Sequence, residues 1–248
     1  MAGILKVDQI QNTAGVNIMD LQNDEIRVWN GSGYSSMATP GALISINTFT
    51  SQNGTWNSKS TSGGSGTWTK PNGCGHVLVY VTGGGGGARV NDNSYRGAGG
   101  GGGATAIKYI DVSSVNSVNY TYGGGGGYAR NGGRGGTGGT SSFGNYVSSG
   151  GGQGANRRQQ HEGATGGNPN QGSVRIYGGS GQGHRNPPGL GHGGTSFWGG
   201  SAPTAHRQQQ WAQRHRAHAA YGAGGSSGRN SERGGDGRQG IVVVYEFD

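Results

Sequence analysis

The sequence predicts an all-β fold in which short strands alternate with laterally bonded, extended glycine helices. Three observations predict it. The chain has 60 glycines among 248 residues, most of them after residue 82. One glycine segment repeats every three residues, and strand-like segments frame the longest glycine runs, at 83–87, 99–103 and 123–127. These runs have no side chains to pack, so backbone hydrogen bonds must hold them together.

Disorder is the alternative that the composition favours. A chain with 60 glycines and 6 prolines lies in the range where low-complexity disorder is the usual interpretation. Ordering the glycines costs roughly 0.5 to 1 kcal/mol each relative to alanine, or about 30 to 60 kcal/mol for the set. The periodic segment and the framing strands favour order, because a disordered tract needs neither.

The periodic segment predicts the local conformation. Residues 132–140 repeat Gly-Gly-X with a strict period of three, which is the residue period of the polyproline II helix. Arg134, Thr137 and Thr140 would then line one edge, and the other two edges would be bare glycine. Bare edges let neighbouring helices approach until their amides bond, with a net gain of about 1 kcal/mol per bond. Collagen uses the same helix but needs abundant proline, which this chain lacks.

The composition changes twice along the chain and divides it into three parts. The first has an ordinary composition and predicts a small β module. The second is rich in Ser, Thr and Asn and predicts connecting strands. The third is the glycine-rich body. These parts are residues 1–40, 41–72 and 73–248.

Strand-like segments are recognised by their β-branched and aromatic residues. Within residues 1–40 they are short hydrophobic pieces at 3–7 and 26–29. The later ones lie at 43–49, 66–69, 76–81, 104–110, 118–122 and 241–247. The last is almost continuously apolar, which predicts a central strand covered on both faces.

Non-repetitive insertions interrupt the glycine runs, and loops on a rigid scaffold usually carry recognition. They lie at 89–96, 156–162, 168–177, 184–190 and 197–221. The last insertion predicts the one helix of the chain, over 204–221, because residues 207–220 contain neither glycine nor proline. At helical spacing Trp211, His215 and His218 would share a face.

The overall composition bounds the stability and the partners. A hydrophobic content of 29% is low for one ordinary core of this size, which predicts self-association. The single cysteine, Cys74, excludes an intrachain disulfide framework. The formal charge of +8 comes from 15 arginines and 4 lysines. Arginine favours bidentate contacts with carboxylates and phosphates, so we expect anionic partners.

A fixed order of motifs extends over residues 66–248. Gly-Thr-Trp-Thr-Lys-Pro at 66–71 is followed by an apolar strand, the glycine blocks, Thr-Ser-Ser-Phe-Gly at 140–144 and a final apolar strand at 240–246. This order resembles the glycine-rich domain of bacteriophage tail fibres and adhesins. Separately, residues 3–12 resemble the opening of tail-fibre proteins from marine phages.

The resemblance implies an all-β fold with a polyglycine II helix bundle, in which a small β-sandwich flanks the stacked glycine helices. It implies hypervariable loops at one end that bind an outer-membrane protein or a surface polysaccharide of the host. It also implies a homotrimer, or attachment to a trimeric shaft. The Arg/His/Gln-rich residues 184–221 depart from the pattern by interrupting the glycine rhythm, which points to them as the specificity element.

Motifs for catalysis or cofactors are weak. A P-loop needs lysine after glycine, and none of the four lysines has that neighbour. The carboxylates between Gly75 and Gly240 show no recognisable acid–base pair, so we expect no enzyme and no cofactor. His206, His215 and His218 have metal-ligand spacing but lack acidic or cysteine co-ligands, so we expect no metal.

Arginine–glycine motifs raise the alternative of nucleic-acid binding. Arg-Gly-Gly occurs at 134–136 and 233–235, as in RNA-binding disordered proteins. The aromatic residues lie in strands rather than between these motifs, so we expect no nucleic-acid partner.

We therefore expect a phage tail-fibre receptor-binding protein, present in the virion and extracellular after release. Its partners would be a bacterial outer-membrane protein or lipopolysaccharide and, through the N-terminus, other virion tail proteins. A purely structural tail component is the alternative, in which the aromatics cap glycine helices and the arginines form a solvated rim. The candidate receptor-binding residues are Tyr95, Arg96, Arg157, Arg158, His161, Arg185, Trp198, Trp211, Arg214, His215 and Tyr221.

Overall fold

The structure is a computed structural model of the 248-residue chain. It describes residues 41–51, 61–90, 97–129, 133–156, 163–183, 191–201, 220–228 and 234–248, together with the backbone of four N-terminal strands. All regular secondary structure in these ranges is β, which confirms the all-β prediction. The same ranges contain no helix long and apolar enough to cross a membrane.

The four N-terminal strands form an antiparallel sheet in chain order. They are β1 (Gln9–Gln11), β2 (Asn17–Gln22), β3 (Glu25–Trp29) and β4 (Tyr34–Ser36). The hydrophobic piece expected at 26–29 lies in β3, and the piece at 3–7 falls outside the described residues.

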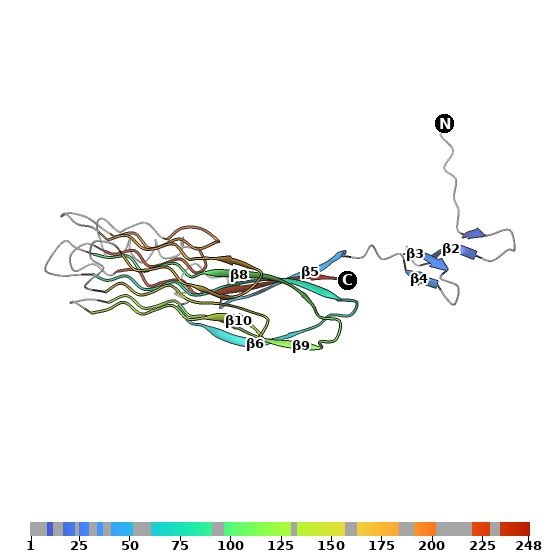
Figure 1. The fold of residues 1–248 in the computed structure, drawn as a ribbon, viewed down its shortest axis with the longest axis horizontal. Helices are drawn as coiled ribbons and strands as arrows, with labels where there is room; N and C mark the ends of the chain where they lie inside the picture. The colour runs from blue at the N-terminus through green and yellow to red at the C-terminus, as the bar shows by residue number, and fades with distance from the viewer. Residues whose placement is uncertain are drawn as a thin grey trace, which may run out of the picture.

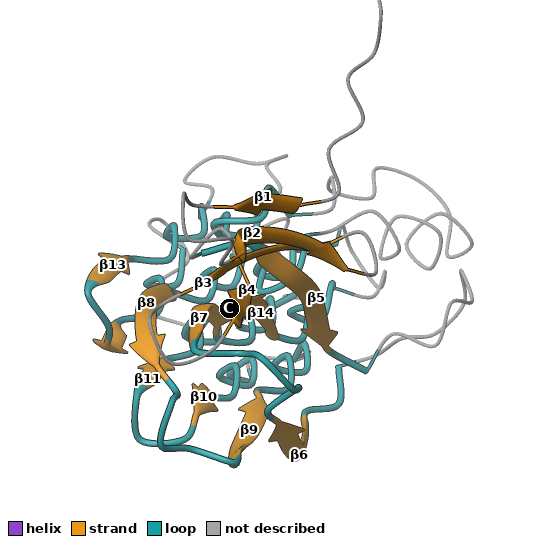
Figure 2. Ribbon diagram, turned by 90° about the vertical axis from the view of Figure 1, so that its right-hand side faces the viewer, coloured by secondary structure: helices purple, strands orange, loops and turns teal. Residues whose placement is uncertain are grey.

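Two five-stranded antiparallel sheets form a β-sandwich in the rest of the chain (Figure 2). Sheet I has the order β13-β8-β7-β14-β5, formed by Val174–Ile176, Thr105–Asp111, His76–Thr82, Ile241–Phe247 and Leu43–Phe49. Sheet II has the order β12-β11-β10-β9-β6, formed by Pro169–Gln171, Val147–Ser149, Ser141–Phe143, Ser117–Tyr122 and Gly64–Thr69.

The core lies between the two sheets. Alternate residues of β7 point inward, and Val77, Val79 and Val81 are fully buried. They belong to one cluster with residues of sheet II such as Trp68 and Phe143, whose ring centroids lie 5.7 Å apart. Period-two alternation therefore builds the core from both sheets, as a half-buried strand requires.

The expected strands from residue 43 onward are all present, and β14 is central, between β7 and β5. β10 to β13 were not predicted from the sequence. These strands have three residues each, which is too short for an alternating pattern to register. β5 and β6 come from residues 41–72, expected to connect the domains, and they form part of the two sandwich sheets.

Glycine-rich segments continue from the sandwich strands and run side by side along the long axis of the molecule (Figure 1). We call them together the glycine block. Its segments are residues 83–90, 97–104, 123–129, 133–140, 150–156, 163–168, 177–183, 191–195, 222–228 and 234–240. Segment 83–90 leaves β7, for example, and 97–104 returns to β8.

Hydrogen bonds between the segments repeat every three residues. Gly83, Gly86 and Arg89 donate their N–H groups to segment 97–104, Gly84 and Gly87 to 133–140, and Gly85 and Ala88 to 234–240, at N···O distances of 2.8 to 3.0 Å. The carbonyls of 83–90 also accept bonds from segments 123–129, 150–156 and 222–228. Segment 83–90 thus has six bonded neighbours, whereas a β-strand has two.

Glycine is required inside the block because the backbones approach too closely for a side chain. A Cβ added at Gly84, Gly86 or Gly101 would lie 2.0 Å from a carbonyl oxygen of a neighbouring segment. In the periodic segment the side chains lie at the surface: Arg134 and Thr137, three residues apart, are both exposed. Thr140 is exposed as well, so the three non-glycine residues expected to share an edge all lie at the surface.

The helix expected over 204–221 falls largely outside the described residues. Only Ala220 and Tyr221 of that range are described, and Tyr221 lies in a turn.

Candidate functional site

The ends of the glycine segments farthest from the sandwich lie together, and we call this surface the distal end (Figure 1). Arg89 forms isolated β-bridges with Ala98 and Ala129, and Ala98 forms another with Gly183. The buried side chains of Ala98, Ala155 and Ala164 form a cluster there. Residues from segments that are far apart in the sequence are therefore neighbours at this end.

Five stretches of chain each join two segment ends at the distal end, and all five fall outside the described residues. They are 91–96, 130–132, 157–162, 184–190 and 229–233. The candidates that belong to them are Tyr95, Arg96, Arg157, Arg158, His161 and Arg185. The described residues on either side of these stretches lie together at one end of the glycine block.

Trp198 is described, and it lies at the junction between the glycine block and the sandwich. Its indole Nε1 donates a hydrogen bond of 2.8 Å to Oγ1 of Thr82, the last residue of β7. Its ring lies 6.1 Å from that of Tyr80 and 5.1 Å from that of Phe197. These contacts favour a packing role for Trp198.

Tyr221 also lies at this junction. Its carbonyl accepts a hydrogen bond from Ser196 Oγ. The next residue, Gly222, donates to the carbonyl of Gln239, 2.8 Å away and just before β14. Nearby, burial lowers the pKa of the Arg238 guanidinium, and Tyr221 opposes that shift.

Trp211, Arg214 and His215 belong to residues 202–219, which fall outside the described residues. The stretch starts after Ser201, whose hydroxyl lies 3.3 Å from that of Ser226. It ends before Ala220, whose N–H donates to the carbonyl of Gly200 at 3.1 Å. Ser201 therefore lies beside segment 222–228 of the glycine block, and Ala220 lies beside Gly200.

A family model described as a glycine-rich domain matches residues 59–246. The chain belongs to this glycine-rich domain family. A comparison with curated proteins found no match. The matched residues run from before β6 to β14, so they include nine strands of the sandwich and the whole glycine block. β5 and the four N-terminal strands lie before the matched range.

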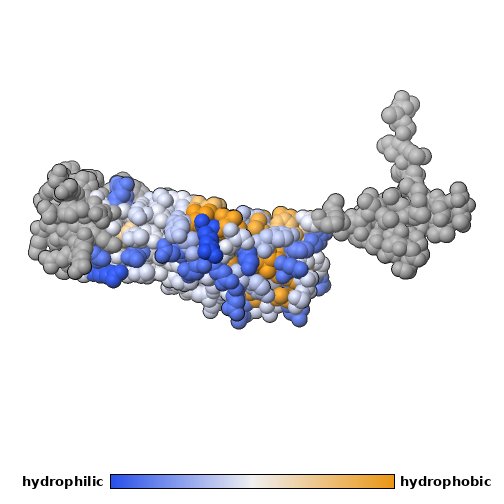
Figure 3. Space-filling model, in the orientation of Figure 1, coloured by the Kyte–Doolittle hydropathy of each residue, from blue (hydrophilic) through white to orange (hydrophobic). Residues whose placement is uncertain are grey.

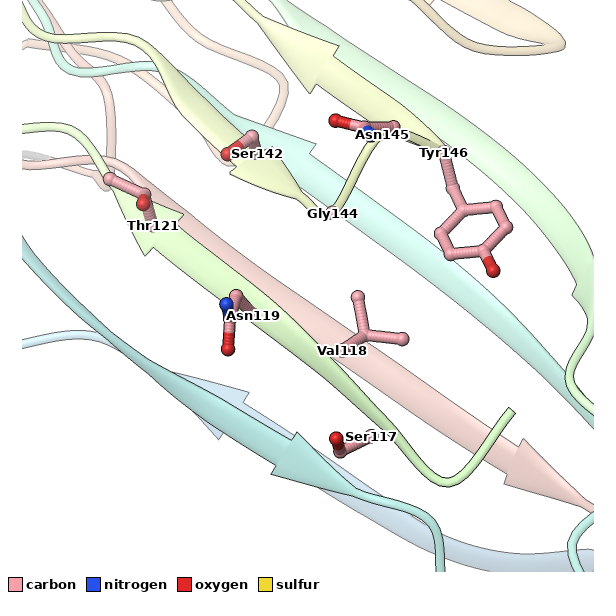
Figure 4. Close-up of a pocket in the computed structure, with 8 residues that line it drawn as sticks. All are labelled: Ser117, Val118, Asn119, Thr121, Ser142, Gly144, Asn145 and Tyr146. Atoms are coloured by element: carbon pink, nitrogen blue, oxygen red, sulfur yellow. The ribbon is translucent and has the colours of Figure 1, made fainter.

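The glycine-rich domain has a second possible site, a depression of about 480 Å³ on sheet II (Figure 4). Its lining residues are Ser117, Val118, Asn119, Thr121, Ser142, Gly144, Asn145 and Tyr146. Hydroxyl and amide groups dominate, which suits hydrogen bonding to a neutral polar ligand. The lining has no carboxyl group, imidazole or amine for acid–base catalysis.

Two charged residues that make internal contacts in the domain, Arg89 and Asp236, were not singled out from the sequence. Arg89, on the central segment 83–90, is only 1% exposed. The carboxylate of Asp236 accepts a hydrogen bond of 2.8 Å from the N–H of Tyr128, on another segment. Neither residue stands out in the sequence, because their burial depends on which segments become neighbours. In the described ranges, no three His, Cys, Asp or Glu side chains are grouped as metal ligands.

Proposed function

We propose that this glycine-rich domain protein is a bacteriophage tail-fibre receptor-binding protein that recognises the host surface through loops at the distal end. The observation that carries the proposal is the meeting of segment ends there: Arg89 forms β-bridges with Ala98 and Ala129, and Ala98 forms one with Gly183. Each chain stretch that joins two of these ends is anchored on both sides. Sequence can then vary in the loops while the block stays constant, which is what a recognition platform requires.

We infer that the segments of the glycine block are polyglycine II helices. The support is the rotation of donors along segment 83–90, where consecutive N–H groups address three neighbours in turn. A turn of three residues is the geometry of the polyproline II helix. The approach of 2.0 Å that a Cβ at Gly86 would make to Gln153 O explains why the helices are made of glycine.

A rigid platform lowers the entropic cost of binding. Loops held at both ends by a bonded block lose less conformational freedom on contact than free loops do. The arginines of 157–162 and 184–190 suit phosphates and acidic sugars, such as those of lipopolysaccharide, through bidentate bonds. The net charge of +8 adds long-range attraction to an anionic surface.

The remaining partners follow from the same proposal. The N-terminal strands attach the protein to other virion tail proteins, and the assembled form is a homotrimer. The protein is then part of the virion and extracellular after release. Trp198 is better assigned to the junction than to receptor contact, because its indole is bonded to Thr82 of the sandwich, and Tyr221 lies at the same junction through the bond of its carbonyl to Ser196.

A structural tail component without receptor contact is the second candidate. The observation that favours it is that the side chain of Trp198, a candidate aromatic, makes internal contacts with Thr82 and Tyr80. In that case the distal end would be covered by another virion protein.

Adsorption to cells tests the proposal. Purified full-length protein is labelled and added to a panel of bacterial strains, and its ability to block infection is measured. We expect saturable binding to host strains, and at least tenfold weaker binding by an Arg157→Ala/Arg158→Ala/His161→Ala variant. The matched control is Arg175→Ala, because Arg175 is exposed on β13 in the sandwich. Wild-type protein that neither binds cells nor blocks infection would refute the receptor-binding role and favour the structural one.

A further inference from the structure

The outward face of sheet I, which points away from sheet II, is mostly apolar. Strand alternation places on it Ile44, Ile46, Thr48, His76, Leu78, Tyr80, Thr82, Thr105, Ile107, Tyr109, Asp111, Val174, Ile176, Ile241, Val243, Tyr245 and Phe247. An antiparallel sheet that packs on one core usually shows polar residues on its other face. Sheet I departs from this rule, although its inward residues, such as Val79 and Val244, are already fully buried.

Several of these side chains remain exposed in the single chain. The exposed fractions are 51% for Ile46, 55% for Tyr109 and 51% for Val174. Leu43, Ile44 and Phe197 are also exposed. Soluble monomers rarely expose large contiguous apolar patches, and a larger one usually marks an interaction site. Figure 3 shows hydrophobic residues gathered over the sandwich, whereas the glycine block is pale or hydrophilic.

We propose that this face packs against the corresponding faces of other copies of this chain. A homo-oligomer interface suits this face, because the buried core of such interfaces is about 65% apolar. Another copy covers Ile46, Tyr109 and Val174, which are exposed in the single chain.

The charge distribution favours a copy over a different partner. Besides tyrosines, alternation places only His76 and Asp111 as ionisable groups on this face of the five described strands, and the two are opposite each other in register. A surface of this kind does not repel itself, although the whole chain carries +8. An anionic partner would be drawn to the arginine-rich parts of the chain instead.

The aromatic residues of the face are already held in place. The ring of Tyr80 lies 5.7 Å from that of Tyr245 and 5.9 Å from that of Phe197. The ring of Tyr109 lies 5.2 Å from that of His76 and 6.4 Å from that of Phe247. Such fixed aromatics lose little freedom on association and are typical anchors of interface cores.

The face lies on the side of the molecule, because the sandwich strands run along its long axis (Figure 1). Association through it therefore leaves the distal end free. The inference does not depend on the proposed function, since a structural component could associate in the same way.

Sedimentation velocity of the full-length chain tests the inference. We expect wild-type protein to sediment as an oligomer. Ile46→Glu/Tyr109→Glu places charges on two exposed positions, and we expect it to raise the concentration needed for association at least tenfold. The matched control is Thr121→Glu, on an exposed position of β9 in sheet II, which should associate like wild type.

Three results would overturn the inference: wild-type protein that stays monomeric at high concentration, an oligomer that the double variant leaves unchanged, or equal weakening by Thr121→Glu. If the double variant does not fold, hydroxyl-radical footprinting of wild type replaces it. Tyr109 must then become protected as the concentration rises, and unchanged labelling would refute the interface. No cells are used, so this outcome is independent of the adsorption experiment.

Discussion

The indole Nε1 of Trp68 donates a hydrogen bond of 2.5 Å to Oε1 of Glu246, and both side chains are buried between the two sheets. Trp68 lies on β6 of sheet II and Glu246 on β14 of sheet I. Asn47 Nδ2 also donates to Oε1 at 2.8 Å, and Ser45 Oγ donates to Oε2. One buried carboxyl group therefore joins three strands, and its burial is tolerated because it is bonded.

Trp68→Phe should destabilise the protein by about 1 to 3 kcal/mol, because it removes one donor to a buried acceptor. Glu246→Leu should cost more, since it leaves Trp68, Asn47 and Ser45 without their shared acceptor. Chemical denaturation measures both. A Glu246→Leu loss no larger than that of Trp68→Phe would show that the carboxyl group does not have this joining role.

Gly86→Ala should destabilise the glycine block by at least about 3 kcal/mol, because its Cβ would lie 2.0 Å from Gln153 O and cannot rotate away. Gly127→Ala is the matched control, since a Cβ there meets nothing within 4 Å. We expect the control to be neutral or slightly stabilising. Thermal unfolding compares the two, and equal melting temperatures would contradict the close packing.

Amide hydrogen exchange along segment 133–140 should follow a period of three. The N–H groups of Gly135, Gly136, Gly138 and Gly139 donate to neighbouring segments at 2.7 to 2.9 Å, so we expect them to exchange slowly. Thr137 lies between them and is exposed, so it should exchange fast. NMR or mass spectrometry with residue resolution measures this. Protection of every second amide would instead indicate a β-strand and refute polyglycine II helices.

Asp111 should contribute to the pH dependence of stability. The hydroxyl and the N–H of Ser113 bond to its carboxylate at 2.6 and 2.9 Å, which lowers the pKa of Asp111. A lowered folded-state pKa gives stability that is complete above the unfolded value of about 3.9 and is lost as the pH falls through the folded value.

Ser113→Ala should therefore raise the pKa of Asp111 towards its ordinary value and reduce this acid-side loss. An NMR titration of the Asp111 carboxyl group follows the change directly. A pKa that Ser113→Ala leaves unaltered would show that another group stabilises the carboxylate.

Strand positions were predictable because the signals are local. Val77, Val79 and Val81, together with Tyr80, are β-branched or aromatic residues, and this enrichment predicts a strand without knowledge of its partners. The three-residue strands β10 to β13 were not predictable, because only their pairing with longer strands such as β8 and β9 makes them strands.

The candidate site was likewise predictable from the sequence only in part. The insertions into the glycine runs are visible in the sequence, and so is their suitability as loops. Trp198 was predictable as an aromatic in an insertion, but its bond to Thr82 depends on a contact 116 residues away along the chain. Arg89 could not be singled out, since its burial follows from segments that surround 83–90 in space.

The sequence by itself determined the β class, the places where glycine runs begin and end, and the exposed edge of Arg134, Thr137 and Thr140. These follow from the enrichment in β-branched and aromatic residues and from the period of three, which are properties of one segment. Only the tertiary structure decided which glycine segments are neighbours, where Trp198 and Tyr221 lie, and that Glu246 joins the sheets. The physical reason is that glycine segments expose the same amides on every side, so their partners are set by the positions of the strands that carry them.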